Sequence, residues 1–297
     1  MRLRHIEVIE AILHAGNTAA AAELLGLTPD ILAATLLEAE QQLGFLLFAK
    51  VRGRLQATPE TLILRAQIAE VQSGLQHFRR AADALRLHQE RPLRVACTEP
   101  LAQQLLPMAI ATLRRRFQDT QCSLASQDAN EIVRHLLLDD IDLGLSLYDP
   151  EHPQISTTPL AHGKVQLLAP RGWLTARQKY IGLQQTAGQS MIGLQHADAL
   201  SHVLESRLIS VRPSPRIQTR VHSYQMMRSL VEAGEGLALV DPFTAAGAEP
   251  SRVDRCPVSP VIPVTLFSLS RHDREPGAAH KALVEIVEEK ARALLGL

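Results

Sequence analysis

Apolar residues recur at helical spacing near the start of the chain, in short stretches that glycines interrupt. Residues 4–14 carry apolar side chains on one face, and Gly16 ends that stretch. An alanine-rich segment over residues 19–25 predicts a second, short helix. Gly26 then permits a tight turn into the next stretch, because glycine adopts backbone conformations that other residues avoid.

The third stretch begins with a strong helix-start signal. Thr28 can cap the helix, Pro29 suits its first turn, and Asp30 faces the positive end of the helix dipole. Apolar residues then follow at steps of four, three and four up to a stop at Gly44 (Leu32, Leu36, Ala39 and Leu43). Two helices joined by a tight turn predict a helix-turn-helix, the motif whose second helix enters the DNA major groove.

A basic turn follows this pattern. The apolar run over residues 45–48 leads into Lys50, Arg52 and Arg54, and Gly53 lies between the two arginines. An apolar strand, a basic turn with glycine and a returning strand predict a small β-wing. Its tip is placed to contact DNA phosphates or the minor groove.

From residue 59 to residue 87 the sequence predicts one long helix. Its apolar positions alternate at spacings of four and three, which is the pattern of paired helices (Leu64, Ile68, Val71, Leu75, Phe78, Ala82 and Leu85). We expect this helix to dimerise the protein, because a single helix that follows a small wing has little core of its own to join. The alternative interpretation is one face of an ordinary core helix.

Strand and helix patterns alternate after a polar hinge at residues 89–92. The predicted strands cover residues 93–97, 122–126, 142–147, 164–169, 191–194, 217–221, 237–240 and 264–269, and the predicted helices cover residues 100–117, 130–138, 199–209, 223–233 and 278–294. This alternation predicts two α/β lobes with parallel strands, joined by two linking strands. A ligand of such a fold binds in the crevice at the carboxyl ends of the strands.

Composition and charge bear on these predictions in opposite ways. Of the 297 residues, 46% are hydrophobic, which is enough for two or three folded domains. Residues 1–60 hold five basic and seven acidic side chains, a net charge of −2 that argues against tight DNA binding. The N-terminus is unlike a secretory signal and no apolar run is long enough to span a bilayer, so we expect a cytoplasmic protein without membrane contact.

Motifs of catalysis and metal binding are missing from the sequence. It contains no G-x-S-x-G, H-E-x-x-H or P-loop motif, and its twelve histidines lack the spacing of metal ligands. We therefore expect no enzyme, no metal site and no cofactor. The cysteines (Cys97, Cys122 and Cys256) lie far apart and predict buried thiols, with a redox-sensing pair as the alternative.

The chain resembles the LysR-type transcriptional regulators over nearly its whole length. The similar segments are the helix-turn-helix and wing (residues 16–25, 28–32 and 43–48) and parts of both lobes (residues 93–98, 140–145 and 223–240). The resemblance implies an α/β protein. Its N-terminal domain would be an all-α winged helix-turn-helix, and its C-terminal effector domain would have two lobes like a type II periplasmic binding protein.

The resemblance also implies domain boundaries and partners. The DNA-binding domain would cover residues 1–58, the dimerisation helix residues 59–88 and the effector domain residues 89–297. The expected partners are double-stranded promoter DNA, a small-molecule effector and further copies of the chain in a dimer or a tetramer. RNA polymerase is a further candidate partner.

The DNA-facing residues depart from the family pattern. The resemblance assigns DNA contact to the start of the third helix and to the wing (Thr28, Pro29, Asp30, Ala33, Ala34, Thr35, Lys50, Arg52 and Arg54). The family usually carries a serine and a basic residue where Ala33 and Ala34 stand, and alanine cannot hydrogen-bond to DNA. Either DNA binding survives through the remaining threonines, the basic wing and the avidity of an oligomer, or the head has drifted and mainly dimerises.

The family binds its effector between the two lobes. Polar side chains at the carboxyl ends of the predicted strands are therefore the candidates (Thr98, Asp128, Asn130, Tyr148, His196, Ser223 and Asp241). Hydroxyls beside free helix N–H groups suit a carboxylate, whereas Asp128 or Asp241 would favour a cationic group. Helix capping and solvated loops are the alternative roles for any single residue. We expect a small amino-acid-like or carboxylate metabolite as the effector.

Overall fold

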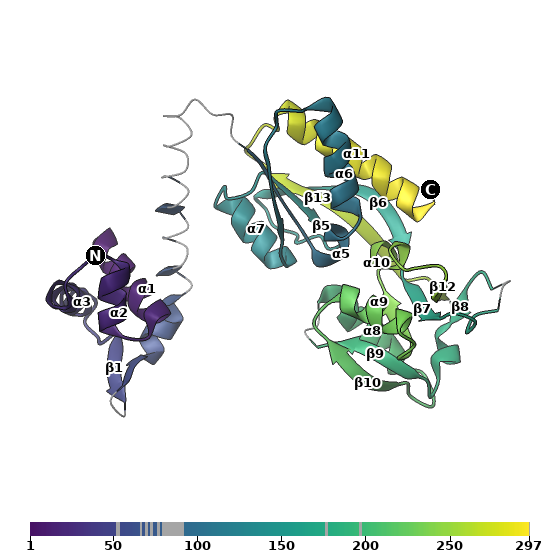
Figure 1. The fold of residues 1–297 in the computed structure, drawn as a ribbon, viewed down its shortest axis with the longest axis horizontal. Coiled ribbons are helices and arrows are strands. Elements are labelled where there is room, and N and C mark those ends of the chain that lie inside the picture. Colours follow the sequence, from purple (N-terminus) through teal and green to yellow (C-terminus); the bar gives the residue numbers. More distant parts are fainter. Residues whose placement is uncertain are drawn as a thin grey trace. The chain divides into compact units, whose positions relative to one another are not determined.

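The computed structural model describes residues 1–51, 54–65, 67, 68, 71, 74, 75, 78, 92–175, 178–195 and 198–296. The chain divides into two compact units, Met1–Gln89 and Glu90–Leu297 (Figure 1). The elements described in the first unit are α1 (Leu3–Ala15), α2 (Thr18–Leu24), α3 (Pro29–Leu43), β1 (Phe48–Val51) and β2 (Arg54–Ala57).

The helices of the first unit share one apolar core. Val8 of α1 and Leu32 of α3 are fully buried there. Helix α3 begins as the sequence predicts, because the hydroxyl of Thr28 accepts a hydrogen bond from the N–H of Ile31 at 3.4 Å. The helix ends at Gly44, whose φ of 81° is a conformation that glycine adopts without strain.

The wing is an antiparallel pair of strands attached to the end of α3. Strand β1 pairs with β2, with Phe48 opposite Ala57. The carboxylate of Glu40 in α3 accepts hydrogen bonds from the N–H of Leu47 at 2.7 Å and of Phe48 at 3.3 Å. This acid therefore holds the wing in place.

The long helix predicted over residues 59–87 lies largely outside the described residues. Leu64 packs against the core of the first unit, and Ile68 is buried in it. Val71 and Phe78 are 44% and 69% exposed. Leu85, the last position of the predicted seam, lies outside the described residues.

Lobe 1 of the second unit is built on a five-stranded sheet in the order β4-β3-β5-β13-β6. Its elements are β3 (Leu93–Cys97), α5 (Glu99–Ala102), α6 (Leu105–Arg116), β4 (Cys122–Ser126), α7 (Ala129–Leu137), β5 (Leu143–Ser146), β6 (Ile155–Lys164), β13 (Pro263–Arg271) and α11 (Ala278–Leu295). Strand β3 runs parallel to β4 and β5, whereas β13 runs antiparallel to β5 and β6. Helices α6 and α11 pack on one face of the sheet and α7 covers the other (Figure 1).

Lobe 2 contains a four-stranded sheet in the order β11-β7-β12-β8 and the parallel pair β9–β10. Its elements are β7 (Gln166–Pro170), β8 (Ile181–Gly182), the 3-10 helix η1 (Leu183–Thr186), β9 (Ser190–Leu194), α8 (Ala199–Leu208), β10 (Arg216–Val221), α9 (Tyr224–Glu232), β11 (Ala238–Val240), α10 (Pro242–Ala246) and β12 (Val253–Ser259). A parallel bridge between Met191 and Leu237 joins the pair to the sheet.

The chain passes between the lobes at two adjoining points. Strand β6 leads into β7 through Val165, and β12 returns into β13 through residues 260–262. The N–H of Val165 donates to the carbonyl of Ile262 at 3.0 Å, and the N–H of Val258 donates to the carbonyl of Val165 at 3.2 Å. These are the two linking strands that the sequence predicts, and they bring the two lobes into contact.

Several element predictions were wrong. The single helix expected over residues 100–117 is two helices, α5 and α6. Pro107 is the reason, because proline lacks an N–H and fits only the first turn of a helix, so α6 begins just before it. Strands β6, β8 and β12 were missed, since Pro159 and Pro257 interrupt the patterns of β6 and β12 and β8 is only two residues long. The short helix α10 was also missed.

Candidate DNA-binding face and interlobe site

The outer face of α3 offers few hydrogen-bond donors. Asp30, Ala33 and Ala34 are all exposed. The hydroxyl of Thr35 donates to the carbonyl of Ile31 at 2.8 Å, so its proton is used within the helix. Pro29 has no N–H to donate. The structure thus places these predicted residues on one accessible helix face whose chemistry is mostly apolar.

Two acids of α3 act within the head itself. Glu38 forms an ion pair with Arg2 at 2.8 Å, and its other oxygen lies 3.4 Å from the ring nitrogen of the buried His5. Glu40 is occupied by the wing backbone. Both carboxylates are therefore engaged within the head.

The basic wing residues are only partly described. Lys50 lies in β1 opposite Leu55, and Arg54 begins β2 opposite Val51. Arg52 lies outside the described residues. The backbone of the wing therefore brings Lys50 and Arg54 onto neighbouring strands.

In lobe 1 the carboxyl ends of three strands meet at one edge. The N–H of Thr98, just after β3, donates to the carbonyl of Leu145 in β5 at 3.0 Å. The N–H of Gln127, just after β4, donates to the carbonyl of Cys97 at 3.0 Å. The side-chain oxygens Oγ1 of Thr98 and Oε1 of Gln127 are buried, and neither has a hydrogen-bond partner among the described residues. This edge thus holds two adjacent polar groups whose bonding capacity is unused.

In lobe 2 the start of α9 faces this region. The hydroxyl of Ser223 accepts the N–H of Met226 at 3.2 Å and so caps the helix, which is the alternative role foreseen for it. The buried Tyr224 donates its phenol proton to Asp198, with 3.0 Å between the oxygens. Burial, together with the negative charges of Asp198, Asp241 and Glu99, raises the pKa of this phenol far above its ordinary value.

Asp241 is completely buried and begins α10. One of its carboxylate oxygens accepts hydrogen bonds from the N–H groups of Phe243 at 2.8 Å and Thr244 at 2.9 Å. Burial raises the pKa of Asp241 to about 6, although these hydrogen bonds act in the opposite direction. This acid is therefore a buried helix cap beside the interlobe contact.

Glu99 joins the two lobes, and the sequence prediction missed it. Its carboxylate oxygens accept hydrogen bonds from the N–H of Tyr224 at 3.1 Å and of Gln225 at 3.3 Å. Helices α5, α9 and α10 contact one another at this place (Figure 1). The signal available in the sequence was the acid next to Thr98, which reads as an ordinary first-turn residue of a helix.

No hydrogen bond or ion pair between described residues joins the other predicted effector residues to this cluster. Asp128 is exposed and accepts the N–H of Glu131 at 2.9 Å, so it caps α7. Asn130 is exposed, and Tyr148 is 48% exposed. His196 lies outside the described residues. The structure thus gathers Thr98, Ser223 and Asp241 from the predicted set.

An arginine lies under the same interlobe contact. Arg228 of α9 is largely buried and forms a 3.5 Å ion pair with Glu232. A Cβ atom on Gly247, at the end of α10, would overlap the guanidinium of Arg228 and lie 3.2 Å from the amide nitrogen of Gln104. Gly247 therefore makes room for a lobe 2 arginine to approach a lobe 1 glutamine.

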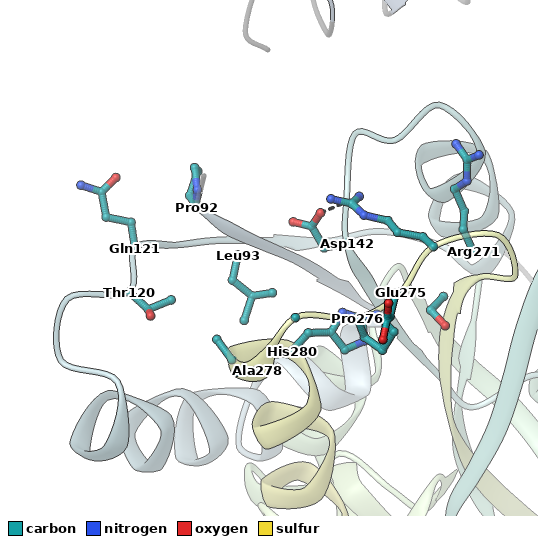
Figure 2. Close-up of a pocket in the computed structure, with 14 residues that line it drawn as sticks. Pro92, Leu93, Thr120, Gln121, Asp142, Arg271, Glu275, Pro276, Ala278 and His280 are labelled. Atoms are coloured by element: carbon teal, nitrogen blue, oxygen red, sulfur yellow. Dashed lines mark ion pairs between the residues drawn. The ribbon is translucent and has the colours of Figure 1, made fainter. Parts of the chain in front are cut away.

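A hollow lies at the opposite edge of lobe 1, where β3 and β5 begin. It has a volume of about 260 Å³ and is lined by Leu93, Asp142, Arg271 and His280, among others (Figure 2). Its aspartate and arginines are already paired. Asp142 binds Arg94 with two side-chain bonds of 3.0 and 3.2 Å, and Arg274 lies 2.8 Å away.

The thiols and the possible metal ligands show no reactive arrangement in the part of the chain described. All three cysteines are free, and burial together with the charge of Glu99 raises the pKa of Cys97 to about 12. No group of three or more metal-ligating side chains occurs within the described ranges.

No single described helix is long and apolar enough to cross a membrane. Helices α2 and α3 meet that measure only as a pair bent by 103°.

Comparison with known proteins identifies both parts of the chain. Residues 3–61 match the family described as bacterial regulatory helix-turn-helix protein, lysR family. Residues 87–292 match the family described as LysR substrate binding domain.

Similar proteins extend over most of the chain. The transcriptional activator protein LysR of Escherichia coli is 28% identical over 94% of this chain and 89% of its own length. The HTH-type transcriptional regulator DgcR of a Pseudoalteromonas species is 26% identical over 83% of this chain and 85% of its own. Full-length CbnR, solved in complex with its target DNA, shares the fold at 20% identity, with a TM-score of 0.72 over 97% of this chain and 99% of that one. The chain belongs to the LysR family of DNA-binding transcriptional regulators, which carry a ligand-binding domain behind a helix-turn-helix head.

Proposed function

We propose that this regulator responds to a small effector that carries a carboxylate, an amino-acid-like metabolite above all, and binds it between the two lobes. The observation that carries the proposal is a pair of buried, unpartnered oxygens at the carboxyl ends of neighbouring strands. The hydroxyl of Thr98 can donate to a carboxylate, and the amide oxygen of Gln127 can accept from an ammonium group. A buried polar group without a partner costs free energy, so such groups persist where a ligand completes them.

The other groups of the interlobe site suit both ends of an amino acid. Asp198 and Asp241 supply carboxylates that would attract an ammonium group. The backbone N–H groups at the start of α9 suit a carboxylate, and in this structure the carboxylate of Glu99 occupies them. The effector class follows from this pairing of acceptors in one region with donors in another.

A thermal-shift screen of the full-length protein tests the effector class. We expect at least one amino acid to raise the melting temperature in a saturable manner, and Thr98→Val to abolish the shift. Asp119→Ala is the matched control, because Asp119 is an exposed acid of lobe 1 that precedes β4, at the opposite end of the sheet. Stabilisation by an aromatic acid such as benzoate, with none by any amino acid, would overturn the proposal.

For the head we propose DNA contact through the start of α3 and the wing, in a dimer or tetramer. The residues are those named from the sequence (Thr28, Pro29, Asp30, Ala33, Ala34, Thr35, Lys50, Arg52 and Arg54). Exposed Val71 and Phe78 support pairing through the helix beyond the head, because apolar side chains at heptad spacing need a partner surface. Two weakly binding heads in one oligomer add their contacts on one DNA molecule.

A fluorescence-anisotropy titration against the DNA upstream of the protein's own gene tests this proposal at several salt concentrations. We expect competitor-resistant binding at low salt. Lys50→Ala should weaken binding to all sequences and reduce the salt slope by about one. Lys281→Ala is the control, since Lys281 is exposed on α11 of the effector domain.

A drifted head that mainly dimerises is the second candidate. The exposed Ala33 and Ala34 and the internally bonded Thr35 favour it, because they leave the face of α3 short of donors. The same titration decides between the two. An oligomer that shows no competitor-resistant binding at low salt would establish the drifted head.

A further inference from the structure

The first turn of α9 has no N–H group left for an incoming ligand. The N–H groups of Tyr224 and Gln225 donate to the carboxylate of Glu99, at 3.1 and 3.3 Å. The N–H of Met226 donates to the hydroxyl of Ser223, and that of Met227 donates to the carbonyl of Ser223. A helix start normally leaves such donors open to water or to an anion.

The contact made by Glu99 has the form of a bound ligand's carboxylate. Two oxygens of one carboxylate accept from two successive N–H groups at the positive end of a nine-residue helix. Glu99 comes from lobe 1, whereas α9 belongs to lobe 2. No arginine or lysine among the described residues forms an ion pair with Glu99, so this backbone pair is its charge partner there.

Other negative charges lie near the contact made by Glu99. Burial is the main cause of the raised pKa of Cys97 and of Asp241, and the negative charge of Glu99 adds to both. Asp198 adds a further carboxylate through its bond to Tyr224. Like charges in a partly buried region repel, so the gain from the two hydrogen bonds is offset in part.

We propose that Glu99 is a built-in carboxylate that holds lobe 1 on the start of α9 until the carboxylate of an effector takes its place. The proposal rests on the effector site of the previous section, and it specifies how that site is regulated. Binding then exchanges an internal carboxylate for an external one at the same two N–H groups. The chain Thr98–Glu99 is thereby released from lobe 2, and the unpartnered hydroxyl beside it becomes free to reorient.

Chemical rescue tests the internal contact without any knowledge of the effector. Glu99→Ala removes a fragment the size of acetate, so acetate is the probe. We expect the variant to melt at a lower temperature than the wild-type full-length protein. Sodium acetate should then raise its melting temperature in a saturable manner, beyond the effect of sodium chloride at equal ionic strength, while the wild type shows no such difference.

Glu235→Ala is the matched control, because Glu235 is an exposed acid beyond the end of α9 on the same lobe. It should show no rescue. If Glu99→Ala does not fold, Glu99→Gln replaces it, since the amide keeps the size and loses the charge. Amide hydrogen exchange at Tyr224 and Gln225 should then accelerate about tenfold, because a charge-assisted bond becomes a neutral one.

The outcomes separate this inference from the proposed function. Equal responses to acetate and chloride in Glu99→Ala would overturn the inference, as would unchanged exchange at Tyr224 and Gln225 in Glu99→Gln. Rescue by acetate together with a screen in which no carboxylate-bearing compound binds the wild type would support the internal contact and sink the proposed effector. In Glu99→Gln, acetate should bind more tightly than in the wild type, because its competitor is weaker.

Discussion

The charged and polar groups at the two ends of the lobe 1 sheet differ in whether they find their partners within lobe 1. Where β3 and β5 begin, Arg94 and Arg274 surround Asp142, and Asp139 completes the cluster. Where the same strands end, Glu99 binds backbone N–H groups of lobe 2, and the oxygens of Thr98 and Gln127 lack partners among the described residues. The first end is electrostatically complete within lobe 1, and the second is completed only from outside it.

The charged groups at the first end stabilise lobe 1, whereas the polar groups at the second end are the candidates for ligand binding. A hollow lined by charged groups, such as that in Figure 2, suggests a binding site by its shape. Its arginines and aspartates are nevertheless each other's partners, and a ligand would have to replace ion pairs that already exist. The interlobe end holds the buried groups for which a ligand would complete hydrogen bonds. The proposed effector site therefore rests on unused bonding capacity and not on concavity.

Asp142→Asn should have the largest effect on stability, because it removes the charge that pairs with Arg94 and Arg274 where β3 and β5 begin. Burial acts to raise the pKa of Asp142, but the hydrogen bonds and charge of Arg94 outweigh it and hold the pKa below its ordinary value. The neutral amide leaves Arg94, whose side chain is only 10% exposed, with much less compensation. We expect a loss of about 3 kcal/mol in the free energy of unfolding, measured by urea denaturation.

Asp119→Asn is the control for this experiment, since Asp119 is an exposed acid of the same lobe. It should change the free energy of unfolding by less than about 0.5 kcal/mol. Equal effects of the two substitutions would show that the cluster around Asp142 is not held by its charges.

The pH dependence of Asp241 should run opposite to that of Asp142. The folded-state pKa of Asp241 is raised to about 6, so folding takes up a proton between its ordinary pKa of 3.8 and this value. The contribution of Asp241 to the free energy of unfolding therefore falls as pH rises through that window, by up to about 3 kcal/mol. The contribution of Asp142, whose pKa is lowered, is present above its ordinary pKa and is lost as pH falls below it.

Urea denaturation of the wild type and of Asp241→Asn at pH 5 and pH 7 measures this difference. Asparagine keeps the cap of α10 and cannot ionise. The wild type should lose more stability than the variant between pH 5 and pH 7, and histidines cancel in the comparison because both proteins contain them. Parallel changes in the two proteins would contradict a raised pKa at Asp241.

Gly247→Ala should disturb only the interlobe end of the lobe 1 sheet, where β3 and β5 end. The φ of Gly247 is −81°, so alanine meets no backbone strain, and the whole effect comes from displacing Arg228. We expect a loss of about 1–2 kcal/mol in urea denaturation. Gly182→Ala is the matched control, because a Cβ there meets no atom within 4 Å. If both alanines are equally tolerated, Arg228 has no fixed place under the interlobe contact.

The fold followed from sequence patterns where these are local. The cap at Thr28 and the alternation of strands with helices from Leu93 onward predicted the head and the two lobes, because capping and hydrophobic periodicity act within a few residues. Strand β6 escaped prediction, since Pro159 sits inside it and is tolerated only beside an irregularity in its pairing with β13.

The candidate site was harder to predict, because its partners are far apart in the sequence. Positions at strand ends pointed to Thr98, Ser223 and Asp241, which the structure does bring together. The same rule also chose Asp128 and Tyr148, which are exposed. No feature of the neighbouring sequence distinguishes the residues that the fold brings together from those that it leaves exposed.

Thr98→Val gives the smallest expected change in stability and the sharpest test of the incomplete end. Valine has nearly the shape of threonine, and the hydroxyl it removes is buried without a partner among the described residues. We therefore expect the ligand-free protein to gain up to about 1 kcal/mol in urea denaturation, or to stay unchanged, while it loses response to an effector. Thr244→Val is the control, because the hydroxyl of Thr244 donates to Asp241 and its loss should destabilise the protein by about 1 kcal/mol. A comparable loss in both variants would mean that Thr98 already has a partner in the free protein. The two ends of the sheet would then be equally complete, and the effector site would have to be sought elsewhere.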